Sequence, residues 1–251
     1  MNQQPSQNQS EWDYCPPLKQ MIETDRAQGK TGKVFDSLGA FSTLGNLRLI
    51  RALMLDKKPQ KTIEIGMAFG GSCLVFASCH RELGHEPAQQ HLALDPFQST
   101  VWDSIALEKL EEAGLSGFVQ HFEQRSAFTL PTLVSQEPES IEMAYIDGSH
   151  LFEDVFIDFY YLTLLAAPGG LLLFDDSTYP DVKKVLRYIN ANLGHLLEPV
   201  DLTPWRDQSQ ESFVKKIGRK VTGRYQMTAY RKLKSLESGE LRSWDAAFNN
   251  F

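Results

Sequence analysis

The 251-residue sequence has few cysteines and no long apolar run. Its three cysteines, Cys15, Cys73 and Cys79, are an odd number without CxxC spacing, so we expect free thiols. No stretch approaches the roughly 18 uncharged apolar residues that a membrane-spanning helix needs. These absences argue against a disulfide-stapled domain, a zinc module and an integral membrane protein.

The sequence also lacks an excess of positive charge. Its net charge of −7 argues against a protein whose main task is to hold nucleic acid, although segment 215–234 is locally basic. The opening residues "MNQQPSQNQSEW" lack the basic and apolar regions of a secretory signal. We therefore expect a cytoplasmic protein without a nucleic-acid or membrane partner, and the sequence leaves open whether it forms a homo-oligomer.

Short apolar runs alternate with helix-length segments through the middle of the chain. The runs are "KTIEIG", "QHLALD", "GFVQHFEQ", "IEMAYID" and "GGLLLFDD". This alternation predicts an α/β fold with a doubly wound, mostly parallel sheet. Two later runs, "LLEPVDL" and "YQMTAYRKL", predict a strand pair that adds an antiparallel edge.

Hydrophobic composition of 42% is enough to fill the core of one main domain of this length. Before the first strand, Leu44, Leu47, Ile50 and Met54 recur at helical spacing and predict a helix that ends before the "DKKPQK" turn. We divide the chain into four parts: a disordered lead-in (1–11), N-terminal helices (12–58), the sheet domain (59–235) and a C-terminal tail (236–251).

A glycine-containing turn follows the first predicted strand. Its pattern is Glu64-x-Gly66-x-x-x-Gly70-Gly71, and an apolar helix begins near Ser72. Glycines let the backbone approach a ligand closely, and free amides at the helix N-terminus attract electron-rich groups. The second glycine of a dinucleotide fingerprint is missing, which disfavours a pyrophosphate ligand. A tight strand-to-helix turn without a ligand is the alternative interpretation.

Acidic residues follow the later strands. Asp147 comes after the fourth predicted strand, and Asp175 and Asp176 come after the fifth. Ligands of open α/β sheets bind outside the carboxyl ends of the strands, so we expect these side chains to converge. Three carboxylates in one crevice raise one another's pKa unless a cation neutralises them, and oxygen ligands suit Mg²⁺, Ca²⁺ or Mn²⁺. The sequence therefore predicts a divalent-cation site, most plausibly for Mg²⁺.

The glycine turn resembles the first motif of class I S-adenosylmethionine-dependent methyltransferases. The segments "DGSH" and "GGLLLFDD" resemble those of metal-dependent O-methyltransferases that act on macrolide sugars, and the catechol type is similar through the same crevice. In the catechol type an Asn usually takes the last acidic position, and a Lys stands where this chain has His150. The resemblance spans roughly Phe41 to Leu233 and implies a Rossmann-like methyltransferase fold, S-adenosylmethionine, and a hydroxyl-bearing small molecule as acceptor.

The resemblance also implies roles for individual residues. Asp95 is expected to bind the ribose hydroxyls, Ser126 the adenine, and His150 to act as general base beside Asp147. The implied sets are, for the cofactor, Glu64, Gly66, Gly70, Gly71, Ser72, Asp95, Ser126 and Asp147; for catalysis, His150 and Asp147; and for the metal, Asp147, Asp175 and Asp176.

Other interpretations remain open from the sequence. Ser126 is also suited to capping a helix, and His150 to capping the helix that follows it. A metal-independent methyltransferase, a catalytically silent cofactor-binding or scaffold protein and a nicotinamide-dependent oxidoreductase are rival functions, because a fold alone does not specify activity. No segment carries a chemical signature of the methyl acceptor.

Overall fold

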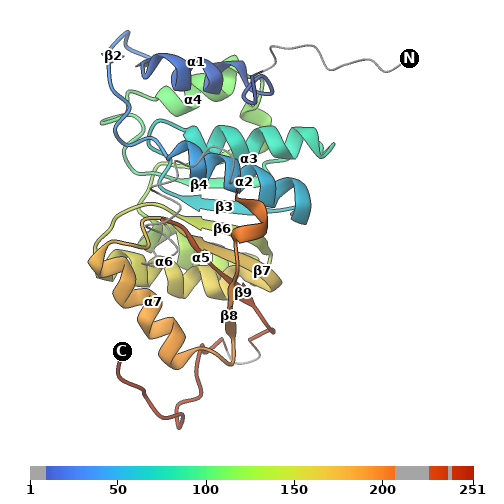
Figure 1. The fold of residues 1–251 in the computed structure, drawn as a ribbon, viewed down its shortest axis with the longest axis vertical. Coiled ribbons are helices and arrows are strands. Elements are labelled where there is room, and N and C mark those ends of the chain that lie inside the picture. The colour runs from blue at the N-terminus through green and yellow to red at the C-terminus, as the bar shows by residue number, and fades with distance from the viewer. Residues whose placement is uncertain (1–9, 207–225, 237–238) are drawn as a thin grey trace.

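The computed structural model describes residues 10–206, 226–236 and 239–251. A seven-stranded sheet runs through the molecule, and helices lie on both of its faces (Figure 1). Its strands, in the order in which they lie side by side, are β5 (Val119–Phe122), β4 (His91–Leu94), β3 (Thr62–Ile65), β6 (Ile141–Ile146), β7 (Ala166–Phe174), β9 (Thr228–Lys232) and β8 (Leu197–Val200).

The helices fall between the strands as the alternation predicts. They are α1 (Pro16–Thr24), α2 (Leu44–Lys57), α3 (Gly71–Glu82), α4 (Ile105–Glu112), α5 (Ser126–Gln136), α6 (Phe152–Leu165) and α7 (Pro180–Asn192), with short 3₁₀ turns at Ser116–Phe118 and Thr203–Trp205. A separate antiparallel pair, β1 (Ala27–Gln28) and β2 (Val34–Phe35), lies between α1 and α2.

The sheet is parallel from β5 to β7. Strand β3 pairs with β4 on one side and with β6 on the other. Along the chain, β4 and β5 extend the sheet on the first side of β3, and β6 and β7 then extend it on the second side. A crevice forms at such a switch point, outside the carboxyl ends of the strands. The sheet topology therefore places the glycine turn after β3 beside the residues that follow β6.

The predicted strands and the mostly parallel α/β fold are confirmed. The late strands are confirmed as well, and β9 lies between β7 and β8, antiparallel to both. Helix α2 extends to Lys57, two residues into the predicted turn, and ends where Lys58 adopts a left-handed conformation with φ 51°. Strands β1 and β2 were not predicted, because strands of two residues show no alternation.

Successive side chains of each strand point to opposite faces of the sheet, so a separate hydrophobic core forms on each face. Met143 and Tyr145 pack with α1, α2, α3 and α4, whereas Ala144 and Ile146 pack with α5, α6 and α7. Except for Glu142, the side chains of β6 are buried on both faces, as expected for a central parallel strand. This burial fixes the end of β6, and with it Asp147.

Both ends of the described chain are attached to the domain. Trp12 is buried, so packing begins where the sequence predicts, and most of the predicted lead-in lies outside the described residues. In the C-terminal tail, the backbone oxygen of Asn249 accepts a hydrogen bond of 3.0 Å from the Asn192 side chain, and Phe248 and Phe251 contact Tyr188. In the described ranges no helix has the length and apolar character that crossing a membrane requires.

Candidate active site

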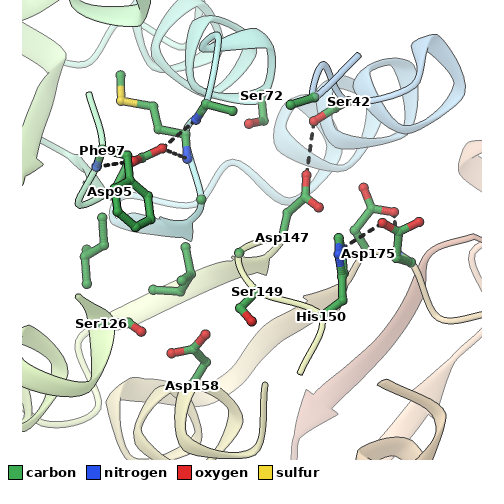
Figure 2. Close-up of a pocket in the computed structure, with 18 of the residues that line it drawn as sticks. Ser42, Ser72, Asp95, Phe97, Ser126, Asp147, Ser149, His150, Asp158 and Asp175 are labelled. Atoms are coloured by element: carbon green, nitrogen blue, oxygen red, sulfur yellow. Dashed lines mark hydrogen bonds and ion pairs between the residues drawn. The ribbon is translucent and has the colours of Figure 1, made fainter. Parts of the chain in front are cut away.

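A cavity of about 630 Å³ opens outside the carboxyl ends of β3, β4, β6 and β7. Its volume is in the range of small-molecule sites. Figure 2 shows Asp95 and Ser126 toward one end of the cavity and Asp175 and His150 toward the other. Of the residues proposed for the cofactor, the walls include Gly66, Gly71, Ser72, Asp95, Ser126 and Asp147.

The glycine turn requires glycine for packing as well as for access. Gly66 has φ 88°, and a Cβ built on it would lie 2.2 Å from the backbone oxygen of Asp147. Gly70 has φ 86°, and its Cβ would lie 2.7 Å from the Cβ of Ala106. The turn thus presses against both β6 and α4, which holds the Asp147 backbone close to the cavity wall.

Glu64, which the sequence assigns to the cofactor, is fully buried beneath the turn and does not line the cavity. Its Oε2 accepts a hydrogen bond of 2.5 Å from Ser72 Oγ, and its Oε1 lies 3.2 Å from Nε2 of His91. Direct contact with a ligand is therefore wrong for Glu64 in this structure, because the carboxylate is enclosed. Its contact with Ser72 fixes a residue that does line the cavity.

Asp95 is buried at the end of β4 and holds the turn from below. Its Oδ2 accepts hydrogen bonds from the backbone amides of Met67, at 3.1 Å, and Ala68, at 2.7 Å, and its Oδ1 accepts one of 2.8 Å from the amide of Phe97. The carboxylate lies at the cavity wall, where the sequence predicts it. Its observed contacts orient the glycine turn, and the ribose role stays a prediction.

Ser126 lines the cavity as the first residue of α5. The helix-capping interpretation is wrong, because Arg125 occupies the N-cap position and no side chain caps the helix. The Ser126 side chain instead interacts with Asp158 of α6, which lines the same part of the cavity. The structure leaves the hydroxyl of Ser126 beside the cavity, which is compatible with its predicted role.

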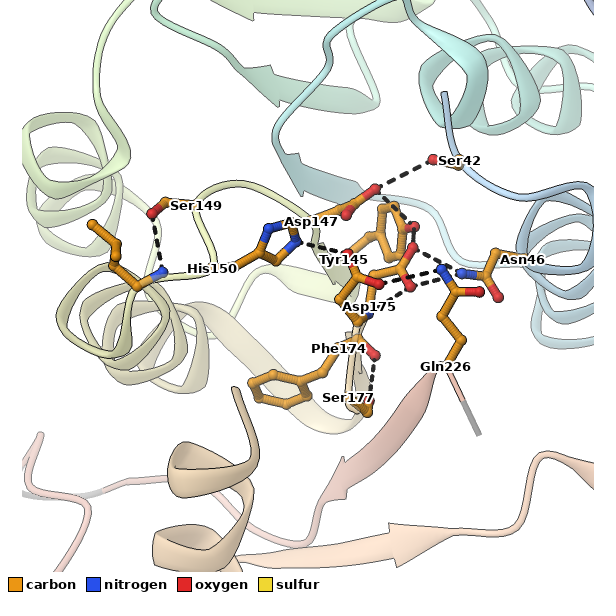
Figure 3. Close-up of polar contacts among 12 residues, drawn as sticks. Ser42, Asn46, Tyr145, Asp147, Ser149, His150, Phe174, Asp175, Ser177 and Gln226 are labelled. Carbon is orange, nitrogen blue, oxygen red and sulfur yellow. Dashed lines mark hydrogen bonds and ion pairs between the residues drawn. The ribbon is translucent and has the colours of Figure 1, made fainter. Parts of the chain in front are cut away.

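The acidic strand ends converge as predicted (Figure 3). Asp147, His150 and Asp176 each offer a ligand atom, and these atoms all lie within 4.8 Å of one another. The three residues come from the ends of β6 and β7, which are paired in the sheet. The arrangement has the residue types and spacing of a site for one metal ion.

Asp175 occupies a different position from the one predicted. Its two carboxylate oxygens accept hydrogen bonds of 2.7 and 2.8 Å from the amide of Asn46, and it also contacts the Tyr145 hydroxyl. The backbone amide of Asp176 donates a further hydrogen bond of 2.6 Å to it. Asp175 is therefore turned toward α2, and His150 takes its place in the three-residue cluster.

Burial and mutual repulsion dominate the electrostatics of the cluster. Burial, and then the charge of Asp175, raise the pKa of Asp147 well above its ordinary value. Burial also raises the pKa of Asp175, although hydrogen bonds from Tyr145 and Asn46 oppose the increase. The Tyr145 hydroxyl lies between both carboxylates, yet a phenol has one proton to donate. The site is thus short of positive charge and donors.

His150 points its Nε2 into this cluster. The atom lies 2.8 Å from Oδ2 of Asp176 but is not aligned for a hydrogen bond, and the ring packs edge-on against Tyr179 at 4.8 Å. The capping interpretation of His150 is wrong, because α6 begins at Phe152 with Leu151 as its N-cap and no side chain caps it. The imidazole nitrogen thus lies beside the Asp176 carboxylate, and the ring lines the cavity.

Sequence reasoning missed several residues that complete the site. Asn46 and Tyr145 are buried polar groups within apolar stretches of α2 and β6. Ser42 donates a hydrogen bond of 3.3 Å to Asp147, and Asp158 brings a further carboxyl group to the cavity. The only signal in the sequence for these residues was a polar side chain at a position that periodicity assigns to the core. Asn46 is such a residue.

Comparison with protein families matches residues 63–177 to a methyltransferase domain. This segment runs from β3 to the residues after β7 and contains the glycine turn, Asp95 and the cluster of Asp147, His150 and Asp176. None of the curated proteins matches the sequence.

Solved structures share the fold at low sequence identity. The O-methyltransferase TomG from Streptomyces achromogenes, solved with S-adenosylmethionine, is 17% identical, with a TM-score of 0.58 and coverage of 90% of this chain and 92% of that one. An O-methyltransferase from Bacillus cereus, in complex with S-adenosylhomocysteine, is 15% identical, with a TM-score of 0.61 and coverage of 87% and 91%. The architecture is therefore that of these enzymes.

Proposed function

We propose that this chain is a class I S-adenosylmethionine-dependent methyltransferase that methylates a hydroxyl group of a small molecule with the help of a divalent cation. The match of residues 63–177 to a methyltransferase domain supports this proposal. The observation that carries the proposal is a cavity with the glycine turn on one side and the Asp147, His150 and Asp176 cluster on another. The relatives of the same fold are O-methyltransferases with bound cofactor or product, which supports oxygen as the acceptor atom.

The cofactor would lie along the glycine turn. Gly66, Gly71 and Ser72 give the cavity a wall without bulky side chains, and Asp95 holds the turn in place through its amide contacts. The methyl group must reach the acceptor oxygen in line with the sulfur, so the sulfonium end would point toward Asp147. The acceptor then occupies the space between Ser42, Asp147 and Tyr179, all of which line the cavity.

The cluster fits a divalent cation. Asp147 and Asp176 offer hard oxygen ligands, and the raised pKa of Asp147 shows a carboxylate in need of positive charge. Asp175, which contacts Asn46 and Tyr145, would hold Asp147 and Asp176 in position. It would become a further metal ligand if those contacts rearranged. A bound divalent cation would lower the pKa of an acceptor hydroxyl and so make it a better nucleophile.

His150 would remove the proton from the acceptor. Its Nε2 faces the cluster without a hydrogen-bond partner among the described residues, and an imidazole nitrogen can accept a proton from a hydroxyl group. Asp176, at 2.8 Å, would stabilise the imidazolium that forms. Binding to a cation through the same nitrogen is the second candidate role, because His150 is also a member of the ligand cluster.

Titration calorimetry of the whole chain tests the cofactor. We expect S-adenosylhomocysteine to bind with a dissociation constant in the micromolar range and NAD⁺ not to bind, because the turn lacks the glycine that admits a pyrophosphate. Binding of NAD⁺ alone would favour an oxidoreductase. Absence of binding for both, in folded protein, would favour a scaffold protein.

Thermal unfolding with Mg²⁺ tests the cation. At about 100 times its dissociation constant, Mg²⁺ should add roughly 2.7 kcal/mol to the free energy of unfolding. Asp176→Asn should remove most of this increment, whereas Asp181→Asn, at a partly exposed acid that pairs with Lys184 outside the cavity, should keep it. Methyl transfer to a set of small phenols and sugars that survives excess chelator would instead identify a metal-independent enzyme.

A further inference from the structure

One acidic residue of the cavity has no place in the chemistry described above. Asp158 lies on α6, and only 2% of its surface is exposed, yet it lines the cavity. Its Oδ1 has no hydrogen-bond partner among the described residues. Figure 2 shows Asp158 and Ser126 directed toward each other, away from His150 and Asp175.

A buried carboxyl group with a free oxygen is costly to keep. Burial raises the pKa of Asp158 to about 7, and the charge of Asp154, one turn away, adds to the increase that the Ser126 side chain opposes. Unpaired polar groups in such places destabilise a fold unless a ligand or water supplies the missing partner. Asp158 lines the cavity, so a ligand that presents an N–H group there would satisfy its free oxygen.

The position of Asp158 identifies which part of the cofactor presents that group. The reacting methyl must lie near Asp147, and Asp95, which is expected to bind the ribose, lies with Ser126 toward the other end of the cavity. The other end of an adenosyl group, its purine, then reaches Ser126 and Asp158. A purine with an exocyclic amine offers an N–H donor beside ring nitrogens that accept hydrogen bonds, which complements a carboxylate beside a hydroxyl.

We propose that Asp158 and Ser126 form the purine-recognition site, in which Asp158 accepts a hydrogen bond from the exocyclic amine of adenine. This inference rests on the proposed use of S-adenosylmethionine and adds a specificity-determining residue to it. Asp158 reaches the site from α6, whereas Ser126 stands at the start of α5, so the pairing of these helices sets the distance between the two groups.

Binding of two ligands to the whole chain tests the proposal. The probes are S-adenosylhomocysteine and its analogue in which hydrogen replaces the exocyclic amine. The parent should bind S-adenosylhomocysteine at least about tenfold more tightly, because hydrogen bonds to charged groups contribute roughly 1.5–3 kcal/mol. Asp158→Leu should reduce this preference below about threefold by weakening only the amine-bearing ligand.

Two further variants keep the test decisive. Asp158→Asn retains an acceptor oxygen and should show an intermediate preference, and it covers the case in which the leucine variant folds poorly. Glu153→Gln, at an exposed residue of the same helix outside the cavity, should keep the parent preference. Equal weakening of both ligands in Asp158→Leu, or a parent without preference, would overturn the inference. A parent that binds neither ligand would contradict the proposed function itself.

Discussion

At the scale of single residues, Gly66 is the position where the turn tolerates least change. A Cβ would lie 2.2 Å from the Asp147 backbone oxygen, and φ is 88°. Gly66→Ala must therefore displace the end of β6 or the turn, and we expect at least tenfold weaker binding of S-adenosylhomocysteine together with a lower melting temperature. Calorimetry and thermal unfolding measure the two effects.

Gly114 provides a matched control. It also has a positive φ, 65°, but a Cβ there would meet nothing within 4 Å. Gly114→Ala should cost roughly 1 kcal/mol from backbone strain and leave ligand affinity unchanged. Equal loss of affinity in both variants would show that stability, and not the shape of the turn, determines binding.

His150 can be tested by separating catalysis from binding. As a general base, His150→Gln should lower turnover by roughly 10²–10⁴-fold while the dissociation constants of S-adenosylhomocysteine and Mg²⁺ change little. Raising the pH should partly restore turnover, because hydroxide replaces the base. His195→Gln, at a histidine bonded to Leu241 outside the cavity, serves as the control. A large loss of Mg²⁺ affinity in His150→Gln would assign the residue to the ligand set.

Asp158 makes the unliganded protein sensitive to pH. Its pKa is raised from 3.8 to about 7, so between these values the folded state holds a proton that the unfolded state has lost. The free energy of unfolding should therefore fall as pH rises from about 4 to 7. Asp158→Asn removes this contribution. The free energy of unfolding of the variant minus that of the parent should therefore be larger at pH 8 than at pH 4, by up to roughly 4 kcal/mol. Denaturant unfolding at both pH values measures it, and an equal difference at both would contradict the assignment.

The sequence predicted most of the residues at the crevice, because strand ends in a parallel sheet must meet there. It did not predict their orientation. Whether Asp175 or His150 completes the cluster depends on Asn46, whose partner lies 129 positions away in the chain. Contacts over such separations are set by packing of α2 against the sheet, and periodicity carries no information about them.

At the scale of elements, β9 is held by a lysine from the locally basic segment 215–234. Lys232 is fully buried, and its Nζ donates hydrogen bonds of 2.7 Å to Glu139 and 2.8 Å to the backbone oxygen of Ala166. These contacts connect β9 to the loop before β6 and to the start of β7. The lysine therefore acts as a structural part of the sheet.

Lys232→Ala should lower the free energy of unfolding by roughly 2–4 kcal/mol, because it removes the donor of the Ala166 carbonyl and the positive charge beside the partly buried Glu139, which keeps the Leu236 amide. Lys234→Ala, at an exposed lysine two residues on, should change it by less than about 0.5 kcal/mol. Urea unfolding measures both. Equal effects would show that Lys232 contributes only general surface charge.

At the scale of the whole molecule, the fold follows from composition and alternation, since each face of the sheet needs its own layer of helices. The sequence predicted the parallel core for that reason. It did not predict the β1 and β2 pair, which pack at the rim of one core with few residues, nor the attachment of the C-terminal tail to α7. Such local contacts depend on a surface that exists only after the core has formed.

The insertion of β9 between β7 and β8 has a consequence for the order in which the protein matures. The outer edge of β7 pairs with residues made after the whole cluster, so a nascent chain that already contains the cluster still presents an open strand edge. Until Thr228–Lys232 leave the ribosome, that edge is free to pair with another chain. Synthesis that stalls between β8 and β9 would therefore release a product with a nearly complete crevice and a strong tendency to aggregate.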